Sequence, residues 1–167
     1  LGLNTGGMGT YSPAPFLSEA ELEQIDRQIM DPWLAGCREE GIDFKGILYP
    51  GIMLTRDGPK VLEFNARFGD PETQVYLPRL ENDLVDLFNA CIDGTLAEVE
   101  LKWSAGVAVC VVMASGGYPE NYEKGKAITG IADADALKDT KVFHAGTKVR
   151  AGEVVTNGGR VDRKSVV

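Results

Sequence analysis

Two oxygen-bearing side chains stand two residues apart in an otherwise apolar segment, at Glu63 and Asn65. The segment 60–66 is typical of a β-strand, in which residues two apart project from the same face, about 6–7 Å from each other. A carboxylate and an amide oxygen on a rigid strand can bind a hard cation, and Mg²⁺ completes its octahedron with water and nucleotide phosphates. We therefore expect a metal site here. The alternative is an edge strand with a solvated polar face.

A charged turn follows this strand directly. It contains Arg67, Asp70 and Glu72, placed around Gly69 and Pro71. This density of charge indicates more than a connection between two elements, and we expect the turn to take part in a site.

The glycine-rich stretch 4–15 is predicted to be a loop. Gly6, Gly7 and Gly9 permit positive φ angles and allow backbone N–H groups to converge on an anion. The stretch lacks the Lys-Ser/Thr pair of a phosphate-binding loop and the spacing of a dinucleotide fingerprint. Taken alone, it is equally compatible with a flexible connector.

Composition limits the classes of function. The chain has 167 residues, a net charge of −8 and a pI near 4.7, so no basic stripe is available for nucleic acid. The odd number of cysteines, three, predicts reduced thiols in a cytoplasmic protein. We expect no membrane segment and no signal peptide. Leu1 is not a start methionine and the chain stops abruptly after Val166-Val167, which suggests a piece of a larger protein.

Hydrophobic periodicity predicts an α+β fold. A capping box at Ser18 and Glu21 begins a helix that Pro32 should kink or split and that Gly41 should end. The segments 44–55 and 60–66 form a hairpin, followed by an amphipathic helix over 80–93 and a buried strand over 105–114. Short strands are expected at 127–131, 142–147 and 154–156, and a loop at 133–139. His144, the only histidine, is expected to be a hydrogen-bonded structural residue.

These motifs closely resemble the phosphoribosylamine–glycine ligase family of the ATP-grasp superfamily. The resemblance lies in NTGGMG at 4–9, YSPAP at 11–15 and EFNARFGDPETQ at 63–74. Three later segments look like the C-terminal domain of that family, ASGGYP at 114–119, VFHAGT at 142–147 and VVTNGGRV at 154–161. By resemblance, residues 1–102 are the C-terminal part of an ATP-grasp domain, an antiparallel sheet with helices. Residues 103–167 are a small, incomplete β-rich domain.

The resemblance implies ATP-dependent ligation of glycine to 5-phosphoribosylamine through glycyl phosphate, in purine biosynthesis. Mg²⁺ or Mn²⁺ would be bound by Glu63 and Asn65, and Arg67 would serve catalysis by holding a substrate carboxylate or the developing acyl phosphate. Asp70 and Glu72 would hold ammonium groups or orient Arg67. The complete set of expected substrate- and nucleotide-binding residues is Asn4, Thr5, Gly6, Gly7, Gly9, Asp70, Pro71 and Glu72.

Two departures from the family pattern stand out. The strand 46–55 carries no further metal carboxylate, which many relatives in the superfamily place there. The substrate-binding N-terminal domain and the lobe that grips the nucleotide would lie before Leu1, so we expect this chain alone to be inactive and its partner to be the N-terminal part of the same enzyme. The rival interpretations are another ATP-grasp carboxylate–amine ligase, such as a formate- or bicarbonate-using purine enzyme, and a non-catalytic binding module.

The last six residues, 162–167, depart from the family in another way. The family continues here with an apolar strand, whereas this chain has a charged Asp-Arg-Lys triplet. One interpretation is a basic tail that binds a partner. The other is that 162–167 are not native protein. In that case we expect them to be exposed or poorly packed, to carry no site, and to leave an unpaired strand edge in the small domain.

Overall fold

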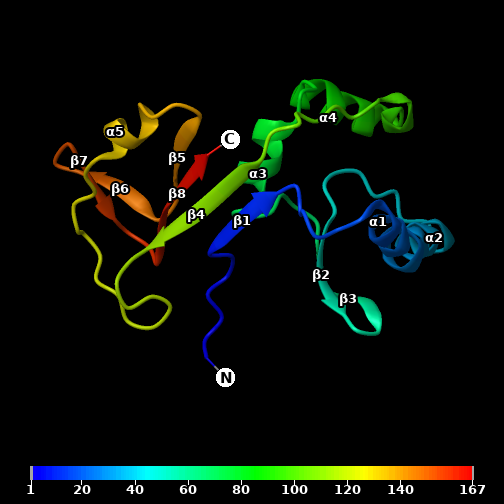
Figure 1. Ribbon diagram of the computed structural model, residues 1–167, viewed down its shortest axis with the longest axis horizontal. Helices are drawn as coiled ribbons and strands as arrows, with labels where there is room; N and C mark the ends of the chain where they lie inside the picture. Colours follow the sequence, from blue (N-terminus) through cyan, green and yellow to red (C-terminus); the bar gives the residue numbers. More distant parts are fainter. Residues whose placement is uncertain (1, 167) are drawn as a thin grey trace. The chain divides into compact units, whose positions relative to one another are not determined.

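The computed structural model describes residues 2–166, which form α-helices and antiparallel β-sheets (Figure 1). Contacts group the chain into two compact units. The first contains the residues up to Pro13, Asp70–Glu81 and the residues from Trp103 onward, and the second contains Ala14–Gly69 and Asn82–Lys102. The expected division at residue 102 differs from this grouping, because the stretches before Pro13 and over Asp70–Glu81 pack with the C-terminal part. Within residues 2–166, no helix is both long and apolar enough to cross a membrane.

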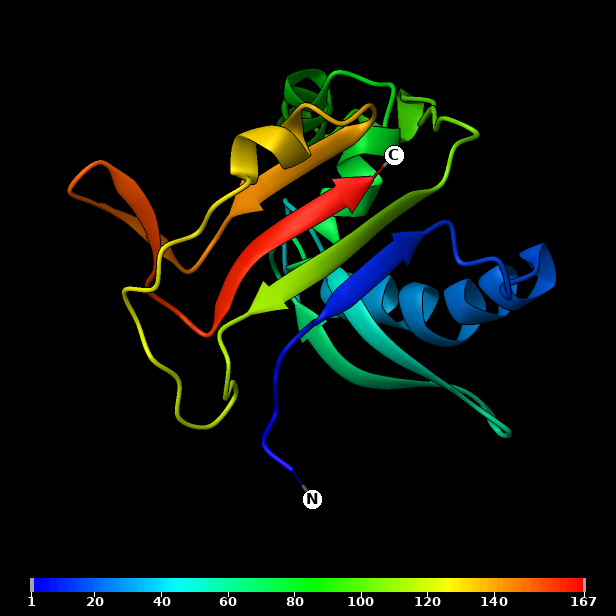
Figure 2. The same ribbon diagram turned by 60° about the vertical axis from the view of Figure 1, so that its left-hand side comes forward.

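A four-stranded antiparallel sheet organises the first unit (Figure 2). Its order is β1 (Gly9–Ser12), β4 (Ala108–Ala114), β8 (Arg160–Val166) and β5 (Thr140–His144). We expected the apolar run around β4 to be buried on both faces. Instead, the even-numbered residues from Ala108 to Val112 are buried while Val109 and Val111 remain exposed, so the sheet covers its core on one side.

The core of this unit forms under the short helix α3 (Thr73–Tyr76). Val75 of α3 packs with Ala108 and Cys110 of β4 into one buried cluster. Burial raises the pKa of the Cys110 thiol. Cys110 is therefore a protonated core residue. It is also free of any disulfide, as are the half-buried Cys37 and Cys91.

The prediction of a loop over 4–15 is wrong for residues 9–12. These residues form β1, in which Thr10 pairs with Cys110 and Gly9 with Val111. The segment carries no hydrophobic alternation that would predict a strand. Its register is specified by its pairing with β4. Such a short edge strand is set by a partner about a hundred residues away in sequence, which a local pattern cannot show.

The expectation for residues 162–167 is also wrong where the structure describes them. Residues 162–166 belong to β8, which pairs with both β4 and β5, while β5 forms an edge of this sheet. Asp162, Arg163 and Ser165 are buried, at 3%, 4% and 1% exposure, and Val166 is 45% exposed. Val167 lies outside the described residues. The buried charges have partners, since Asp162 pairs with His144 and Arg163 pairs with Asp70.

The remaining part of the first unit is a hairpin with a short helix. Strands β6 (Thr147–Arg150) and β7 (Glu153–Thr156) pair with each other. The predicted strand over 127–131 is reduced to one isolated bridge between Ala127 and Val155. The expected loop over 133–139 begins instead inside helix α5 (Ile131–Asp135).

The second unit begins with a helical segment that Ser18 caps as predicted. The Ser18 Oγ accepts from the backbone N–H of Glu21 at 3.3 Å, and the Glu21 carboxylate accepts from the N–H of Ser18 at 2.8 Å. Helix α1 (Glu19–Ile25) continues through a π-helical turn (Asp26–Met30) into α2 (Asp31–Glu39). Pro32 lies in the first turn of α2, directly after the π-helical turn, so the helix changes type near the predicted position but continues without a break.

The predicted hairpin of the second unit is confirmed, with a shorter first strand and a second strand that begins two residues earlier than expected. Strand β2 (Tyr49–Thr55) pairs with β3 (Gly58–Asn65), and the register shifts between Gly51 and Ile52. The amphipathic helix begins later than expected, as α4 (Leu84–Asp93). Its preceding residues include a 3-10 turn (Leu77–Arg79), and a second such turn follows at Leu96–Glu98.

Candidate functional site

Strand β3 presents Glu63 directly opposite Gly51 of β2. A Cβ atom added at Gly51 would lie 3.2 Å from the Cγ of Glu63, closer than an ordinary van der Waals contact. The glycine therefore leaves room for the Glu63 side chain to lie across the neighbouring strand. Gly51 is thus the reason that the Glu63 side chain fits at this register.

Asn65 lies opposite Tyr49, two residues farther along the same pair of strands. Its Nδ2 donates to the backbone oxygen of Tyr49 at 3.4 Å. This hydrogen bond orients the side-chain amide and leaves its Oδ1 as a potential metal ligand. The register shift of the hairpin precedes Glu63, so Glu63 and Asn65 occupy one face of β3, as the sequence predicted.

This donor set fits a hard divalent cation that keeps most of its ligands from water and phosphate. Glu63 and Asn65 supply two oxygen atoms, which suits Mg²⁺ bound mainly by nucleotide oxygens. Among residues 2–166, no group of three or more His, Cys, Asp or Glu side chains is placed to hold a metal ion by itself. The described part of the chain thus has no metal site built from such protein ligands alone. The pair of Glu63 and Asn65 is compatible with a cation that is bound jointly with a nucleotide.

Arg67 follows β3 and lies at the rim of a hollow in the second unit. Its Nη1 donates to the backbone oxygen of Phe68 at 2.9 Å. The hollow has a volume of about 450 Å³ and a mainly apolar lining. Apolar walls around a guanidinium keep out water that would compete with an anion for its donors. The residues that line the hollow include Lys45, Arg67, Phe68, Phe88, Cys91 and Ile92.

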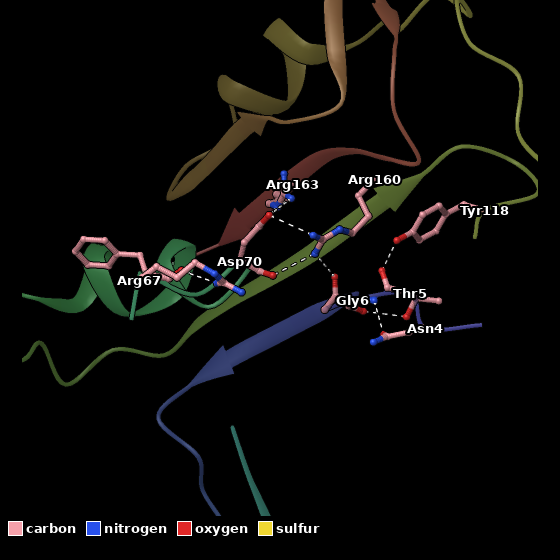
Figure 3. A network of polar contacts seen from close by, with 10 residues as sticks. Asn4, Thr5, Gly6, Arg67, Asp70, Tyr118, Arg160 and Arg163 are labelled. Atoms are coloured by element: carbon pink, nitrogen blue, oxygen red, sulfur yellow. Dashed lines mark hydrogen bonds and ion pairs between the residues drawn. The ribbon is translucent and has the colours of Figure 1, made fainter. Parts of the chain in front are cut away.

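In the first unit, the loop over residues 4–9 has a specific internal hydrogen-bond pattern (Figure 3). The Oδ1 of Asn4 accepts from the N–H of Gly6 at 2.9 Å, and the Oγ1 of Thr5 donates to the oxygen of Gly6 at 2.9 Å. Gly6 has a φ of +67°, a conformation that L side chains rarely adopt. The structure thus brings Asn4, Thr5 and Gly6 together, whereas Gly9 belongs to strand β1.

The 4–9 loop packs against the turn that follows Gly69. A Cβ atom at Gly7 would collide with the ring of Pro71, so only glycine allows this approach. The side chain of Pro71 is fully buried, and its contribution in this structure is to support the loop. Glu72 stands at the start of α3 and is half-buried. Asp70, Pro71 and the loop are therefore brought together as expected.

Asp70 is engaged by two arginines that the sequence did not single out. The Nη2 of Arg160 lies 3.5 Å from the Asp70 Oδ2, and Arg163 forms a closer ion pair with the same carboxylate (Figure 3). Arg160 also donates through Nη1 to the backbone oxygens of Gly7 and Asp70, each at 3.1 Å. These partners lie about ninety residues from Asp70 in sequence, so no local spacing could reveal them. The expected roles of Asp70 toward ammonium groups or Arg67 stay predictions.

Comparison with known proteins gives this geometry its context. Residues 1–73 match the model of the phosphoribosylglycinamide synthetase ATP-grasp (A) domain, and residues 108–163 match the model of the C domain of the same enzyme. A phosphoribosylamine–glycine ligase of Rhodopirellula baltica is 55% identical over 161 residues, covering 96% of this chain and 37% of the relative. A trifunctional purine biosynthetic protein of Drosophila pseudoobscura is 51% identical over 162 residues, covering 96% of this chain and 12% of that protein.

A solved structure supports the same placement. The crystal structure of phosphoribosylamine–glycine ligase from Thermotoga maritima superposes with a TM-score of 0.77 at 37% identity, covering 99% of this chain and 40% of that one. The hairpin that carries Glu63 and Asn65 is therefore part of an ATP-grasp domain, and the class of protein is that of the ATP-grasp ligases. Within that class, the chain belongs to the phosphoribosylamine–glycine ligase family, and it spans a little over a third of the length of its monofunctional relatives.

Proposed function

We propose that this chain is the metal-binding part of an enzyme that joins glycine to 5-phosphoribosylamine with the consumption of ATP. The observation that carries the proposal is the placement of Glu63 and Asn65 on one face of β3, opposite Gly51 and Tyr49, within the part of the chain that matches the ATP-grasp domain. Family membership supports the reaction class, and the two oxygen donors support the use of a nucleotide-bound cation.

The proposed reaction has two steps. A carboxylate oxygen of glycine attacks the γ-phosphorus of ATP, the bond to the bridging oxygen breaks, and ADP leaves with its electron pair. The amine nitrogen of phosphoribosylamine then attacks the carbonyl carbon of glycyl phosphate, and inorganic phosphate leaves as the nitrogen loses a proton. The products are glycinamide ribonucleotide, ADP and phosphate.

The residues of this chain contribute positioning and charge. Glu63 and Asn65 would hold Mg²⁺ or Mn²⁺, which when bound supplies positive charge to the phosphate oxygens during transfer. Arg67 has donors beyond the one used on Phe68 and would hold the carboxylate or the acyl phosphate in a fixed orientation. The 4–9 loop would present backbone amides to an anionic group of a substrate. Phosphoryl transfer is catalysed mainly by such positioning and electrostatic stabilisation.

The test joins this chain to the remainder of a family enzyme. In the Rhodopirellula baltica ligase, the region that matches this chain would be replaced by residues 1–161, so that the sequence of the relative completes β8, and ADP release would be followed with all three substrates. We expect ADP release that requires glycine, phosphoribosylamine and a divalent cation together. Release that continues unchanged without glycine, or formate or bicarbonate replacing it at equal rate, would overturn the proposal in favour of another carboxylate–amine ligase.

A further inference from the structure

We propose that Tyr118 and Arg160 are positioning residues that hold the carbonyl side of the 4–9 loop, so that the amide side of this loop can bind an anionic group, a phosphate or a carboxylate. The identity of that group as part of a ligase substrate rests on the proposed function. The positioning itself rests on contacts within the first unit alone.

Tyr118 contacts the loop from the turn after β4. Its hydroxyl donates to the backbone oxygen of Thr5 (Figure 3). Its own N–H donates to the oxygen of Ser115 at 3.0 Å. The ring lies directly over Gly159, where a Cβ atom would collide with the ring carbons. The glycine before Arg160 is therefore required for the tyrosine to reach the loop.

Arg160 holds the next part of the loop. Its Nη1 donates to the oxygen of Gly7, and its guanidinium lies flat against Gly6, where a Cβ atom would be 3.2 Å from Cζ. The same group donates to the backbone oxygen of Asp70 and lies beside the Asp70 carboxylate. One side chain thus fixes the loop against the turn at Asp70, and a charged partner fixes that side chain.

All carbonyls of the loop from Thr5 to Met8 accept a hydrogen bond. The oxygens of Thr5 and Gly7 are bonded to Tyr118 and Arg160, that of Gly6 to the Thr5 hydroxyl, and that of Met8 to the N–H of Val112 at 3.0 Å. Within residues 2–166, the amide of Gly7 receives no hydrogen-bond partner. The amide of Gly6 is already taken by the Oδ1 of Asn4. The amide of Gly7, next to carbonyls that are all engaged, is therefore a donor suited to bind an anion.

The first experiment measures anion binding by the chain itself. Inorganic phosphate and, separately, acetate would be titrated into the ¹⁵N-labelled protein, and the amide shifts of Gly6 and Gly7 followed. Tyr118→Phe removes one hydroxyl and Arg160→Gln removes the charge and two donors to carbonyls. We expect the wild type to bind the anion saturably. Tyr118→Phe should lower the affinity about fivefold, the value of one net hydrogen bond, and Arg160→Gln should lower it by about tenfold or more. Tyr122→Phe and Arg150→Gln, in the same unit, should leave it unchanged.

The second experiment separates positioning from a loss of structure. In the joined enzyme described above, both variants should raise the KM of one anionic substrate by the same factors while the KM of ATP and the melting temperature stay at the wild-type values. Saturable anion binding without ligase activity would support the loop and overturn only the proposed function. Equal behaviour of Tyr118→Phe and Tyr122→Phe, or no saturable shift at Gly7 in the wild type, would overturn the inference.

Discussion

The guanidinium of Arg67 uses one donor on the backbone oxygen of Phe68, which fixes its direction and leaves the rest of its planar fork for an anion. Lysine keeps the charge of arginine but loses the planar fork and the second parallel hydrogen bond. The shape of the donor group, more than the charge, is therefore what this position contributes to the proposed reaction.

We predict that Arg67→Lys in the joined enzyme lowers kcat by about 10–100-fold, since removal of a preorganised donor typically costs about 10²–10³-fold and lysine retains part of the interaction. Steady-state ADP release gives the rate, and Arg56→Lys in the β2–β3 turn is the matched control with wild-type kcat. A kcat within twofold of the wild type for Arg67→Lys would show that only the charge matters.

Asp135 offers a pH-dependent test of the first unit. Its Oδ2 accepts from the Nζ of Lys141 at 2.5 Å and its Oδ1 from the N–H of Val142 at 2.6 Å. The hydrogen bond from Lys141, followed by that from Val142, lowers the pKa of the Asp135 carboxyl below its usual value. The folded state thus favours the charged form.

The stabilisation from a carboxyl with a lowered pKa is complete above the unfolded pKa, about 4, and is lost as the pH falls through the lower folded pKa. We therefore predict that Asp135→Asn lowers the urea midpoint at pH 7 and that its difference from the wild type shrinks below about pH 4. Asp133→Asn on the same helix is the control. A difference that is equal at pH 7 and pH 3 would contradict this account.

At the scale of elements, β8 is where sequence and structure differ most. The charged residues after Val161 removed the apolar pattern by which a middle strand is recognised, and we expected a poorly packed tail. The structure instead pairs this segment with β4 and β5. The Oδ1 of Asp162 accepts a hydrogen bond from the Nδ1 of His144 at 2.9 Å. His144 is hydrogen-bonded, as expected, and its structural role stays a prediction.

We still propose that 162–167 replace an apolar strand end of the family. The support is that charged side chains occupy buried positions of a middle strand, and that the match to the C domain ends at residue 163. Charges in such positions are stable only when they are paired, and these pairings carry the cost of desolvation. The test is the stability of the chain after Asp162 and His144 are both replaced by leucine, which we expect to equal or exceed that of the wild type.

A single removal at this pair should have the opposite effect. We predict that His144→Ala lowers the free energy of unfolding by about 1–3 kcal/mol, because the Asp162 carboxylate, 4% exposed, loses its partner. His144→Asn places an amide N–H near the position of the ring Nδ1 and should recover most of the loss. Equilibrium urea unfolding measures both variants, and equal stability of His144→Ala and wild type would contradict the pairing.

At the scale of the whole molecule, local patterns predicted the elements better than their grouping. The Ser18 cap and the end of the helix at Asp93 are local chemistry, and both lie at the expected residue, while β3 begins two residues before the expected strand 60–66. Strand β1 and the Arg160–Asp70 contacts join segments far apart in sequence. A single sequence holds no local signal for such contacts, which is why the residues up to Pro13 were assigned away from the C-terminal part with which they pack.

We predict that the 167-residue chain alone does not catalyse the ligation. It covers 37% of the Rhodopirellula baltica relative, and positioning of all substrates supplies much of the rate in such reactions. The measurement is ADP release by the purified chain with ATP, glycine and phosphoribosylamine, with the joined enzyme as the positive control. Release that depends on both glycine and phosphoribosylamine from the chain alone would show that it contains a complete site.

We propose that Glu63 binds the cation that ATP brings, and one variant of this residue tests its role most directly. Glu63→Gln in the joined enzyme keeps the shape of the side chain over Gly51 and removes one ligand charge. We predict a kcat lower by roughly 10²–10³-fold at an unchanged melting temperature, with Asn65→Asp milder and Glu100→Gln at the wild-type rate. A Glu63→Gln enzyme that turns over at the wild-type rate, or that loses activity only because it unfolds, would contradict the account.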